Sequence, residues 1–257
     1  LQAGGYDVAF SPDGKRLAFD SGHQVQIVDA GSGRGLLALA PLDSDAVEVV
    51  FAPDGQRLAV ATFAGLVRIY NSSDGNLLLE FRESTTGLQQ LAFSPDGKRL
   101  ASANDEGGSI WDAITGQQLL IFTGHGKGIR TSGIAFSPDG KWVATTGNDA
   151  AVQVWEAETG NVIFKLTGHT GPAFAVAFSP DGRSLASSSV DRTIKVWQLP
   201  AAGGPVAEPL TLYGHTGAVY RLAFSPDGTR LASTGRNLIA RVYTLRLEEL
   251  VAIAQSR

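Results

Sequence analysis

The sequence predicts an all-β protein that is built from one repeated unit. A turn of the form Ser/Ala-Pro-Asp-Gly occurs six times, at steps of 41, 42, 43, 42 and 46 residues. Each turn follows a short segment that holds apolar residues at every second position, as in a half-buried strand. Gly-His pairs precede this segment in three copies. A strand unit with a period in the low forties is typical of β-propeller blades.

Residues 168–197 are the fullest copy of the unit. Val176 and Phe178 alternate with small alanines, which predicts a first strand that ends at the turn 179–182. Residues 184–188 supply a second strand, and residues 193–197, rich in β-branched and aromatic side chains, supply a third. A meander of this size cannot bury both faces alone. We therefore expect each copy to pack against neighbouring copies.

The other copies are aligned on this one through their turns. The turns begin at Ser11, Ala52, Ser94, Ser137, Ser179 and Ser225. Six blades of the four-stranded type are therefore predicted. The spacer 199–210 contains three prolines and a Gly-Gly pair, and it accounts for the last, longer step. We expect it to form an extended loop between the third and fourth strands of the fifth copy.

At specific residues the sequence resembles the WD-repeat family of propellers. Its Gly-His pairs are Gly124-His125, Gly168-His169 and Gly214-His215, and Trp111-Asp112 matches the Trp-Asp pair of that family. The resemblance covers residues 1–244, which we predict to be the propeller domain. It implies a ring that is closed by both chain ends, usually with seven blades. The six visible blades are therefore expected to belong to a seven-bladed or larger array.

The sequence also supports a prediction for each end of the chain. The chain begins with Leu1 and contains no methionine, which favours a piece of a longer protein. Residues 245–257 place Leu247, Leu250, Val251 and Ala254 on one face at helical spacing, which predicts a C-terminal helix. This tail resembles the segment that follows propellers in large bacterial signalling proteins, such as the sensor ends of signal-transduction ATPases. Its alternative role is to cap an exposed blade edge.

Composition excludes several classes of function. The absence of cysteine rules out disulfides and thiolate metal sites, and it fits a reducing, cytoplasmic compartment. The 21 basic residues are balanced by 25 acidic ones without a basic cluster, so nucleic acid is not expected as a partner. No apolar run approaches the roughly 20 residues of a membrane span. No His, Asp and Glu have metal-ligand spacing, so neither a metal nor a cofactor is expected.

One set of side chains invites a catalytic interpretation. His169, Ser187 and Asp191 could form a serine-hydrolase triad. The resemblance instead assigns them, together with Trp197, to a structural hydrogen-bond tetrad. The same set recurs one copy earlier as His125, Thr145, Asp149 and Trp155, and more weakly in the sixth copy as His215, Ser233, Asn237 and Tyr243. Because enzymes do not usually carry their triad twice, we predict a structural role and no catalytic residue.

The candidate binding residues lie where the first strands begin, four residues before the recurring Phe. The resemblance implies that this ring, with the residue before each tetrad Asp, binds partners on the top face. The first set is Tyr6, Val47, Gln89, Ser132, Phe174 and Tyr220, and the second is Phe63, Asn104, Asn148, Val190 and Arg236. Arg130 lies beside a two-residue insertion in a rim loop. The alternative is that these rings plug the channel mouth.

These observations predict a non-catalytic platform that binds a protein or peptide through its top face. It would be a monomer or part of a larger multidomain chain, and would serve as the sensor or scaffold part of a bacterial signalling protein. One alternative is a propeller enzyme that acts on a small molecule in the central channel. Against it, no cluster of His, Asp and Glu is expected at channel-facing positions of several blades. The other alternative is a purely structural spacer.

Overall fold

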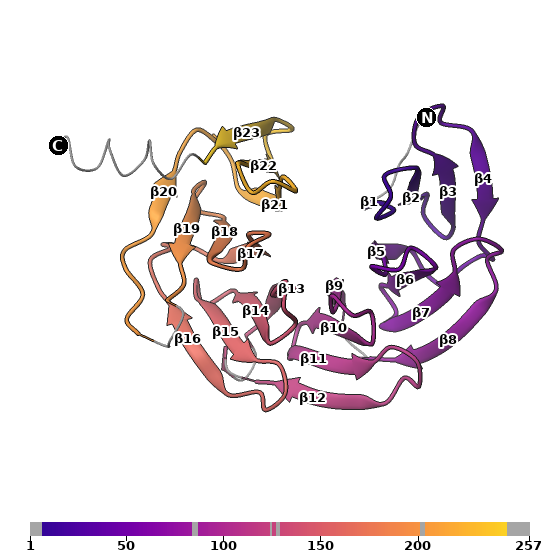
Figure 1. The fold of residues 1–257 in the computed structure, drawn as a ribbon, viewed down its shortest axis with the longest axis horizontal. Helices are drawn as coiled ribbons and strands as arrows, with labels where there is room; N and C mark the ends of the chain where they lie inside the picture. The colour runs from indigo at the N-terminus through magenta and orange to yellow at the C-terminus, as the bar shows by residue number, and fades with distance from the viewer. Residues whose placement is uncertain (1–6, 84–86, 124, 127–128, 201–203, 246–257) are drawn as a thin grey trace.

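Six antiparallel sheets follow one another along an arc in the computed structural model (Figure 1), and their innermost strands line a central cavity. The structure describes residues 7–83, 87–123, 125–126, 129–200 and 204–245. In each sheet the chain runs from the innermost strand outward, and each strand pairs with the next one. The described residues form strands, turns and loops and contain no helix. The all-β propeller predicted from the repeat is therefore confirmed.

Blades one to three contain four strands each. Blade one consists of β1 (Val8–Phe10), β2 (Arg16–Asp20), β3 (Val25–Asp29) and β4 (Gly35–Ala38). Blade two consists of β5 (Ala46–Phe51), β6 (Arg57–Thr62), β7 (Leu66–Asn71) and β8 (Leu77–Arg82). Blade three consists of β9 (Leu88–Phe93), β10 (Arg99–Asn104), β11 (Gly107–Asp112) and β12 (Gln118–Phe122).

Blades four and five also have four strands, whereas the described part of blade six has three. Blade four consists of β13 (Thr131–Phe136), β14 (Trp142–Gly147), β15 (Val152–Glu156) and β16 (Val162–Leu166). Blade five consists of β17 (Ala173–Phe178), β18 (Ser184–Ser189), β19 (Ile194–Gln198) and the short β20 (Leu210–Leu212). Blade six consists of β21 (Val219–Phe224), β22 (Arg230–Gly235) and β23 (Ala240–Thr244).

The Pro-Asp-Gly turns join the first and second strands of each blade by local hydrogen bonds. In blade five the Ser179 hydroxyl donates to Asp181 Oδ1 at 2.6 Å and accepts from the amide of Ser184 at 2.9 Å. Gly182 has a φ of +71°, a left-handed conformation that glycine adopts without steric cost. All of these bonds close within five residues, so the turn can form before the blade packs. The side of the ring that carries these turns is called the turn face.

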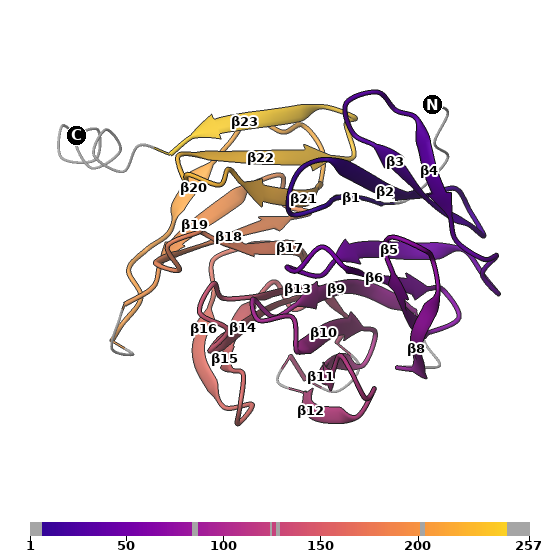
Figure 2. The same ribbon diagram turned by 45° about the vertical axis from the view of Figure 1, so that its right-hand side comes forward.

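The hydrophobic core is divided among the interfaces between successive blades. Between blades five and six, Ala186, Ile194 and Val196 of one sheet pack with Val219 and Leu231 of the other. Equivalent clusters join each earlier pair of neighbours. The innermost strands therefore follow one another around the cavity in the order β1, β5, β9, β13, β17 and β21, a succession that Figure 2 shows from a second side. As expected, each blade buries its faces against its neighbours.

The arc is open between blade six and blade one (Figure 1). Val8 and Phe10 of β1 are 57% and 66% exposed, whereas the equivalent Val176 and Phe178 of blade five are buried. On the opposite edge, Val242 of blade six is 66% exposed. Both edges thus present faces that are buried elsewhere in the molecule. A seventh blade remains a prediction.

Two predictions concern the chain beyond the fifth blade. The segment from Gly204 to Pro209 has no regular secondary structure, in agreement with the predicted extended loop, while residues 201–203 lie outside the described part. The helix predicted for residues 245–257 is not supported, since residues 246–257 also lie outside the described part. Leu245 itself is not helical. Its amide donates to the carbonyl of Thr229 at 2.7 Å, which ties the end of blade six to the turn before its own second strand.

Candidate functional site

The top face is the side of the ring where the innermost strands begin and where loops join the second and third strands. Three apolar residues of the predicted binding set are well exposed there. Phe63, in the loop between β6 and β7, is 51% exposed, and Val190, in the loop between β18 and β19, is 41% exposed. Tyr220, at the start of β21, is 38% exposed. Large apolar side chains on a polar surface are typical of partner contacts.

An aromatic pair joins blades five and six on this face. The rings of Phe174 and Tyr220 lie 5.0 Å apart at an interplanar angle of 83°, an edge-to-face arrangement. Leu238 and Ile239, in the loop between β22 and β23, extend the apolar surface of blade six, and Leu238 is 96% exposed. We refer to Phe174, Val190, Tyr220, Leu238 and Ile239 as the apolar sector.

Sequence reasoning missed Leu238 and Ile239, although the repeat places these two apolar residues in the loop after Asn237. The loop position of Leu238 corresponds to Arg192 in blade five and to Ala150 in blade four, and all three have a positive φ. For Leu238 the value is 55°, a conformation that costs a non-glycine residue on the order of 1 kcal/mol. An apolar side chain on so tight a turn gains nothing from the fold, which makes it a candidate contact residue.

A polar group occupies the top face of blades three and four. Arg130 Nε lies 3.1 Å from Asp105 Oδ1, and the same guanidinium donates to the side-chain oxygen of Gln89. The amide nitrogen of Gln89 donates to Asp105 at 3.3 Å. Arg130 and Gln89 belong to the predicted set, whereas Asp105 was missed. These three residues, the polar sector, link the insertion loop of blade four to blade three.

Three other members of the predicted set are buried and do not present their side chains to a partner. Val47 is buried in the core between blades two and three, and Ser132 is buried at the start of β13. Asn104 is buried too, and it donates to Glu83 at 2.7 Å. Val47 and Ser132 lie on inner strands, which the neighbouring blades cover on both sides, whereas Asn104 ends the second strand of blade three. Asn148 and Arg236 are exposed, and Tyr6 lies outside the described residues.

The triad-like sets form closed hydrogen-bond chains in the interior of blades four and five. In blade five, His169 Nδ1 lies 2.9 Å from Asp191, Nε2 lies 2.8 Å from the Ser187 hydroxyl, and Trp197 Nε1 donates to that hydroxyl at 3.0 Å. The His125, Thr145, Asp149 and Trp155 set repeats the pattern at 3.0, 2.8 and 2.8 Å. Ser187 and Thr145 are fully buried, so no substrate reaches either hydroxyl. The arrangement is suited to holding strands together.

The electrostatics of these sets agree with a structural role. Burial lowers the pKa of His125 and of His169, although the neighbouring carboxylates oppose this shift, so both imidazoles are neutral near pH 7. The proton on Nδ1 then faces the carboxylate, and Nε2 accepts from the hydroxyl. Burial opposes the ionisation of Asp191, but hydrogen bonds from Thr193, the Thr170 amide and His169 outweigh it and lower the pKa of Asp191 to about 2.

Blades three and six contain altered versions of this hydrogen-bond set. In blade three the carboxylate of Glu83 takes the place of the imidazole, because it accepts from the Ser102 hydroxyl at 3.0 Å while Trp111 Nε1 donates to Ser102 at 3.0 Å. Glu83 lies one residue before the position that aligns with His169, so the repeat pattern does not predict its role. In blade six His215 lies 2.8 Å from Ser233 and 3.4 Å from Asn237. The Tyr243 hydroxyl donates to the carbonyl of Tyr213.

A charged group in the central cavity corrects one expectation. Asp7, Glu48 and Arg221, three residues before the recurring Phe of their blades, all line this cavity of about 690 Å³. Arg221 Nη2 lies 3.1 Å from Glu48 Oε2 and 4.0 Å from Asp7 Oδ1. Carboxylates of two blades thus do occupy channel-facing positions, where no cluster of His, Asp and Glu was expected. The three residues come from blades one, two and six.

The two carboxylates share one guanidinium. Burial and the charge of Asp7 raise the pKa of Glu48 well above its usual value, against the attraction of Arg221. Burial likewise raises the pKa of Asp7, although Asp7 accepts a hydrogen bond from the amide of Val49 at 2.9 Å. Arg221 therefore bridges the open side of the arc, because it connects blade six with blades one and two. The geometry shows an ion-paired strut between the blades.

In the described part of the chain, no group of three or more His, Asp and Glu residues is placed to hold a metal ion. No helix there is long and apolar enough to cross a membrane.

Comparison with known proteins places the chain in a family. The model of the WD domain, G-beta repeat, matches residues 75–112, 116–156, 160–198 and 208–244, which together make up more than half of the chain. The chain therefore belongs to the WD domain, G-beta repeat family. Blades one and two, whose tetrad positions hold other residues, lie almost entirely outside these matches.

Individual relatives match over shorter stretches. The periodic tryptophan protein 2 homolog of Dictyostelium discoideum is 34% identical over 26% of this chain and 7% of its own length. The Notchless protein homolog of Arabidopsis thaliana is 34% identical over 24% of this chain and 13% of its own length. An uncharacterized WD repeat-containing protein of Synechocystis is 37% identical over 24% of this chain and 17% of its own length. The chain thus spans less than a fifth of each of these relatives.

Proposed function

We propose that this propeller is a non-catalytic platform that binds a protein or peptide through its top face. The observation that carries the proposal is the apolar sector, where Tyr220 stacks edge-to-face on Phe174 beside the exposed Val190 and Leu238. Rigid aromatic rings offer a large contact area at a low cost in side-chain entropy. A partner with an apolar segment would bury this surface.

The polar sector supports the same proposal from the other side of the face. Arg130 is exposed and already bridges Asp105 and Gln89, so its guanidinium is held in place before a partner arrives. A bound segment with an acidic residue next to its apolar anchor would meet both sectors. Charge complementarity of this kind fixes register and orientation more than it adds affinity.

The wider setting is part of the proposal. We place the platform within a larger protein as its sensor or scaffold part, and the resemblance of residues 245–257 to the tails of bacterial signalling proteins supports that setting. The lack of cysteine supports a reducing, cytoplasmic compartment. A catalytic role has less support, since the hydroxyls of the triad-like sets are buried and the cavity carboxylates are bridged by Arg221.

Selection from a random peptide library displayed on phage tests the platform. Peptides that are enriched on the immobilised protein should lose at least about tenfold in affinity, or about 1.4 kcal/mol, for a variant with Val190→Ser, Tyr220→Ser and Leu238→Ser. The matched control replaces Leu78, Leu119 and Ile121 by Ser, because these are equally exposed apolar residues on outer strands. Equal binding to both variants, or failure to enrich any peptide, would contradict the proposal.

A further inference from the structure

An arginine at the start of the second strand stitches each of the first three blades to the next one. Its guanidinium donates to the carbonyl of the glycine in the Pro-Asp-Gly turn of the following blade and lies over the recurring Phe of that blade. The donations are Arg16 to Gly55 at 2.6 Å, Arg57 to Gly97 at 2.8 Å and Arg99 to Gly140 at 2.8 Å. The Cζ atoms of these arginines lie 5.3, 5.6 and 5.3 Å from the ring centroids of Phe51, Phe93 and Phe136.

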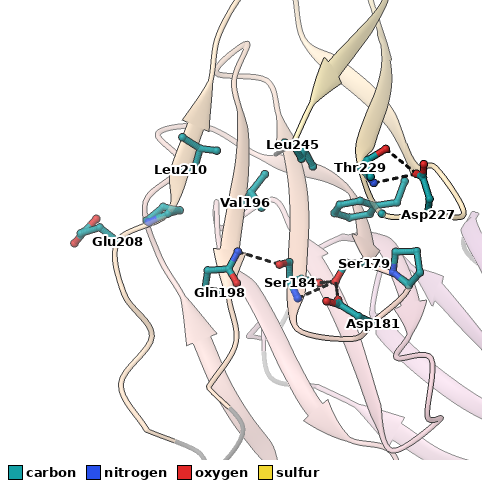
Figure 3. Close-up of a pocket in the computed structure, with 14 residues that line it drawn as sticks. Ser179, Asp181, Ser184, Val196, Gln198, Glu208, Leu210, Asp227, Thr229 and Leu245 are labelled. Carbon is teal, nitrogen blue, oxygen red and sulfur yellow. Dashed lines mark hydrogen bonds between the residues drawn. The ribbon is translucent and has the colours of Figure 1, made fainter. Parts of the chain in front are cut away.

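Blade five has Ser184 at this position, and the stitch is absent there. The Ser184 hydroxyl is engaged within its own blade, since it accepts from Gln198 Nε2 at 3.0 Å. Between blades five and six the turn face holds a pocket of about 720 Å³, lined by Ser184, Phe224 and Gly228 (Figure 3). These are the counterparts of the arginine, the Phe and the glycine of the other interfaces. The pocket thus includes the place that an arginine side chain occupies between the earlier blades.

The interface between blades four and five shows another way to occupy this position. Trp142 stands there, and it packs edge-to-face on Phe164 of its own blade with ring centroids 5.9 Å apart. A smaller pocket of about 370 Å³ remains beside Trp142, and Arg183 is among its lining residues. The larger pocket therefore lies at the interface where the position of the arginine holds the small Ser184.

The lining of the larger pocket suits a cation on an aliphatic stem. Val196, Leu210 and Pro209 form apolar walls, while Asp181, Asp227 and Glu208 supply carboxylates (Figure 3). The described residues that line the pocket include no Lys, Arg or His. Hydrogen bonds from Ser225 and Thr229 lower the pKa of Asp227 to about 2, so this carboxylate is ionised at neutral pH. The pocket thus has negative charge that no described residue in its lining neutralises.

We propose that this pocket binds the guanidinium group of an arginine side chain from a partner polypeptide. The guanidinium would stack on the ring of Phe224 and donate to the carbonyl of Gly228, as Arg16, Arg57 and Arg99 do at their own interfaces. The methylene stem would lie along Val196 and Leu210. This site lies on the turn face and is independent of the top-face platform proposed above.

Nuclear magnetic resonance titration with the tripeptide acetyl-Gly-Arg-Gly-amide tests the proposal. The ¹⁵N-labelled protein carries Arg246→Gln, so that an arginine of its own chain next to Leu245 does not compete. We expect saturable shifts of the amides of Phe224, Gly228 and Thr229. The peptide with citrulline in place of arginine has the same shape without the charge, and it should bind at least about tenfold more weakly. Equal binding of the two peptides, or no shift of these amides, would overturn the proposal.

Two variants locate the site. Ser184→Arg restores the stitch of the earlier blades, so it should remove the tripeptide-dependent shifts and raise the melting temperature. Ser184→Ala leaves the pocket open and should keep them. Persistent binding to Ser184→Arg would place the peptide elsewhere and overturn the assignment.

Tyr220→Ser leaves this pocket untouched, so the tripeptide should still bind to that variant. Failure of the top-face proposal and failure of this one are thus separate results.

Discussion

Blades five and six are built from the same pattern, yet their burial differs. All six residues of β18 (Ser184–Ser189) are buried, whereas in β22 (Arg230–Gly235) only Leu231 and Ser233 are. Ala186 is fully buried and its counterpart Ala232 is exposed. The two strands differ in their surroundings, because blade five has a neighbour on each side and blade six has one. A repeat therefore encodes a face that is able to pack, and the array decides whether it does.

The largest expected effect comes from placing a charge on this face in each blade. Ala186→Asp should lower the free energy of unfolding by about 4 kcal/mol or more, because the carboxylate would be buried in the core between blades five and six. Ala232→Asp should stay within about 0.5 kcal/mol, because its side chain meets water. Chemical denaturation of both variants measures the difference. If Ala232→Asp were as destabilising as Ala186→Asp, the open edge of blade six would be covered in solution.

The next effect concerns the hydrogen-bond sets of the two blades. Asp191→Ala should cost about 1–3 kcal/mol, because it leaves the buried His169 without its 2.9 Å partner. Asn237→Ala should cost less, since Asn237 lies 3.4 Å from His215. Thermal denaturation of the two variants gives the melting temperatures that test this order. Equal losses would show that blade six forms as tight a set as blade five.

Asp191 of blade five also predicts how the stability of the fold depends on acid. The pKa of Asp191 is about 2 in the folded protein, below its ordinary value of 3.8, so its ionised form stabilises the fold. This contribution is present in full above about pH 4 and is lost as the pH falls toward 2. The melting temperature of the native protein should therefore exceed that of Asp191→Asn at pH 7, and the gap should narrow below pH 4. A gap that does not change with pH would contradict the assigned pKa.

The smallest expected effect lies at the edge of blade six. Tyr243 occupies the place of Trp197, but its hydroxyl donates to the carbonyl of Tyr213 at 3.2 Å in an exposed contact. Tyr243→Phe should therefore change the free energy of unfolding by no more than about 0.5 kcal/mol. Trp197→Phe removes the donor to the buried Ser187 and serves as the comparison, with an expected loss of about 1–3 kcal/mol. Denaturant titrations of the two variants should rank them in this order.

Much of the candidate site could be read from the sequence, but not all of it. The exposed Phe63, Val190 and Tyr220 lie on the top face where the repeat predicts them, because each occupies a fixed place relative to a turn. Val47 and Ser132 occupy equivalent places and are buried. How deeply a side chain is buried at the channel mouth depends on how closely the neighbouring inner strands approach each other. Alignment to a repeat carries no information on that distance.

The sequence by itself determined the blade, because a blade is made by interactions between residues close in the chain. The turn at Ser179 is closed within five residues, and the set around His169 spans fewer than thirty. Only the tertiary structure decided the contacts between blades. The bridge from Arg221 to Glu48 joins residues 173 positions apart, and the pocket beside Ser184 arises because an arginine is missing from a stitch between two sheets. Such features depend on the curvature of the whole arc, which brings each sheet to its neighbours and which no single repeat specifies.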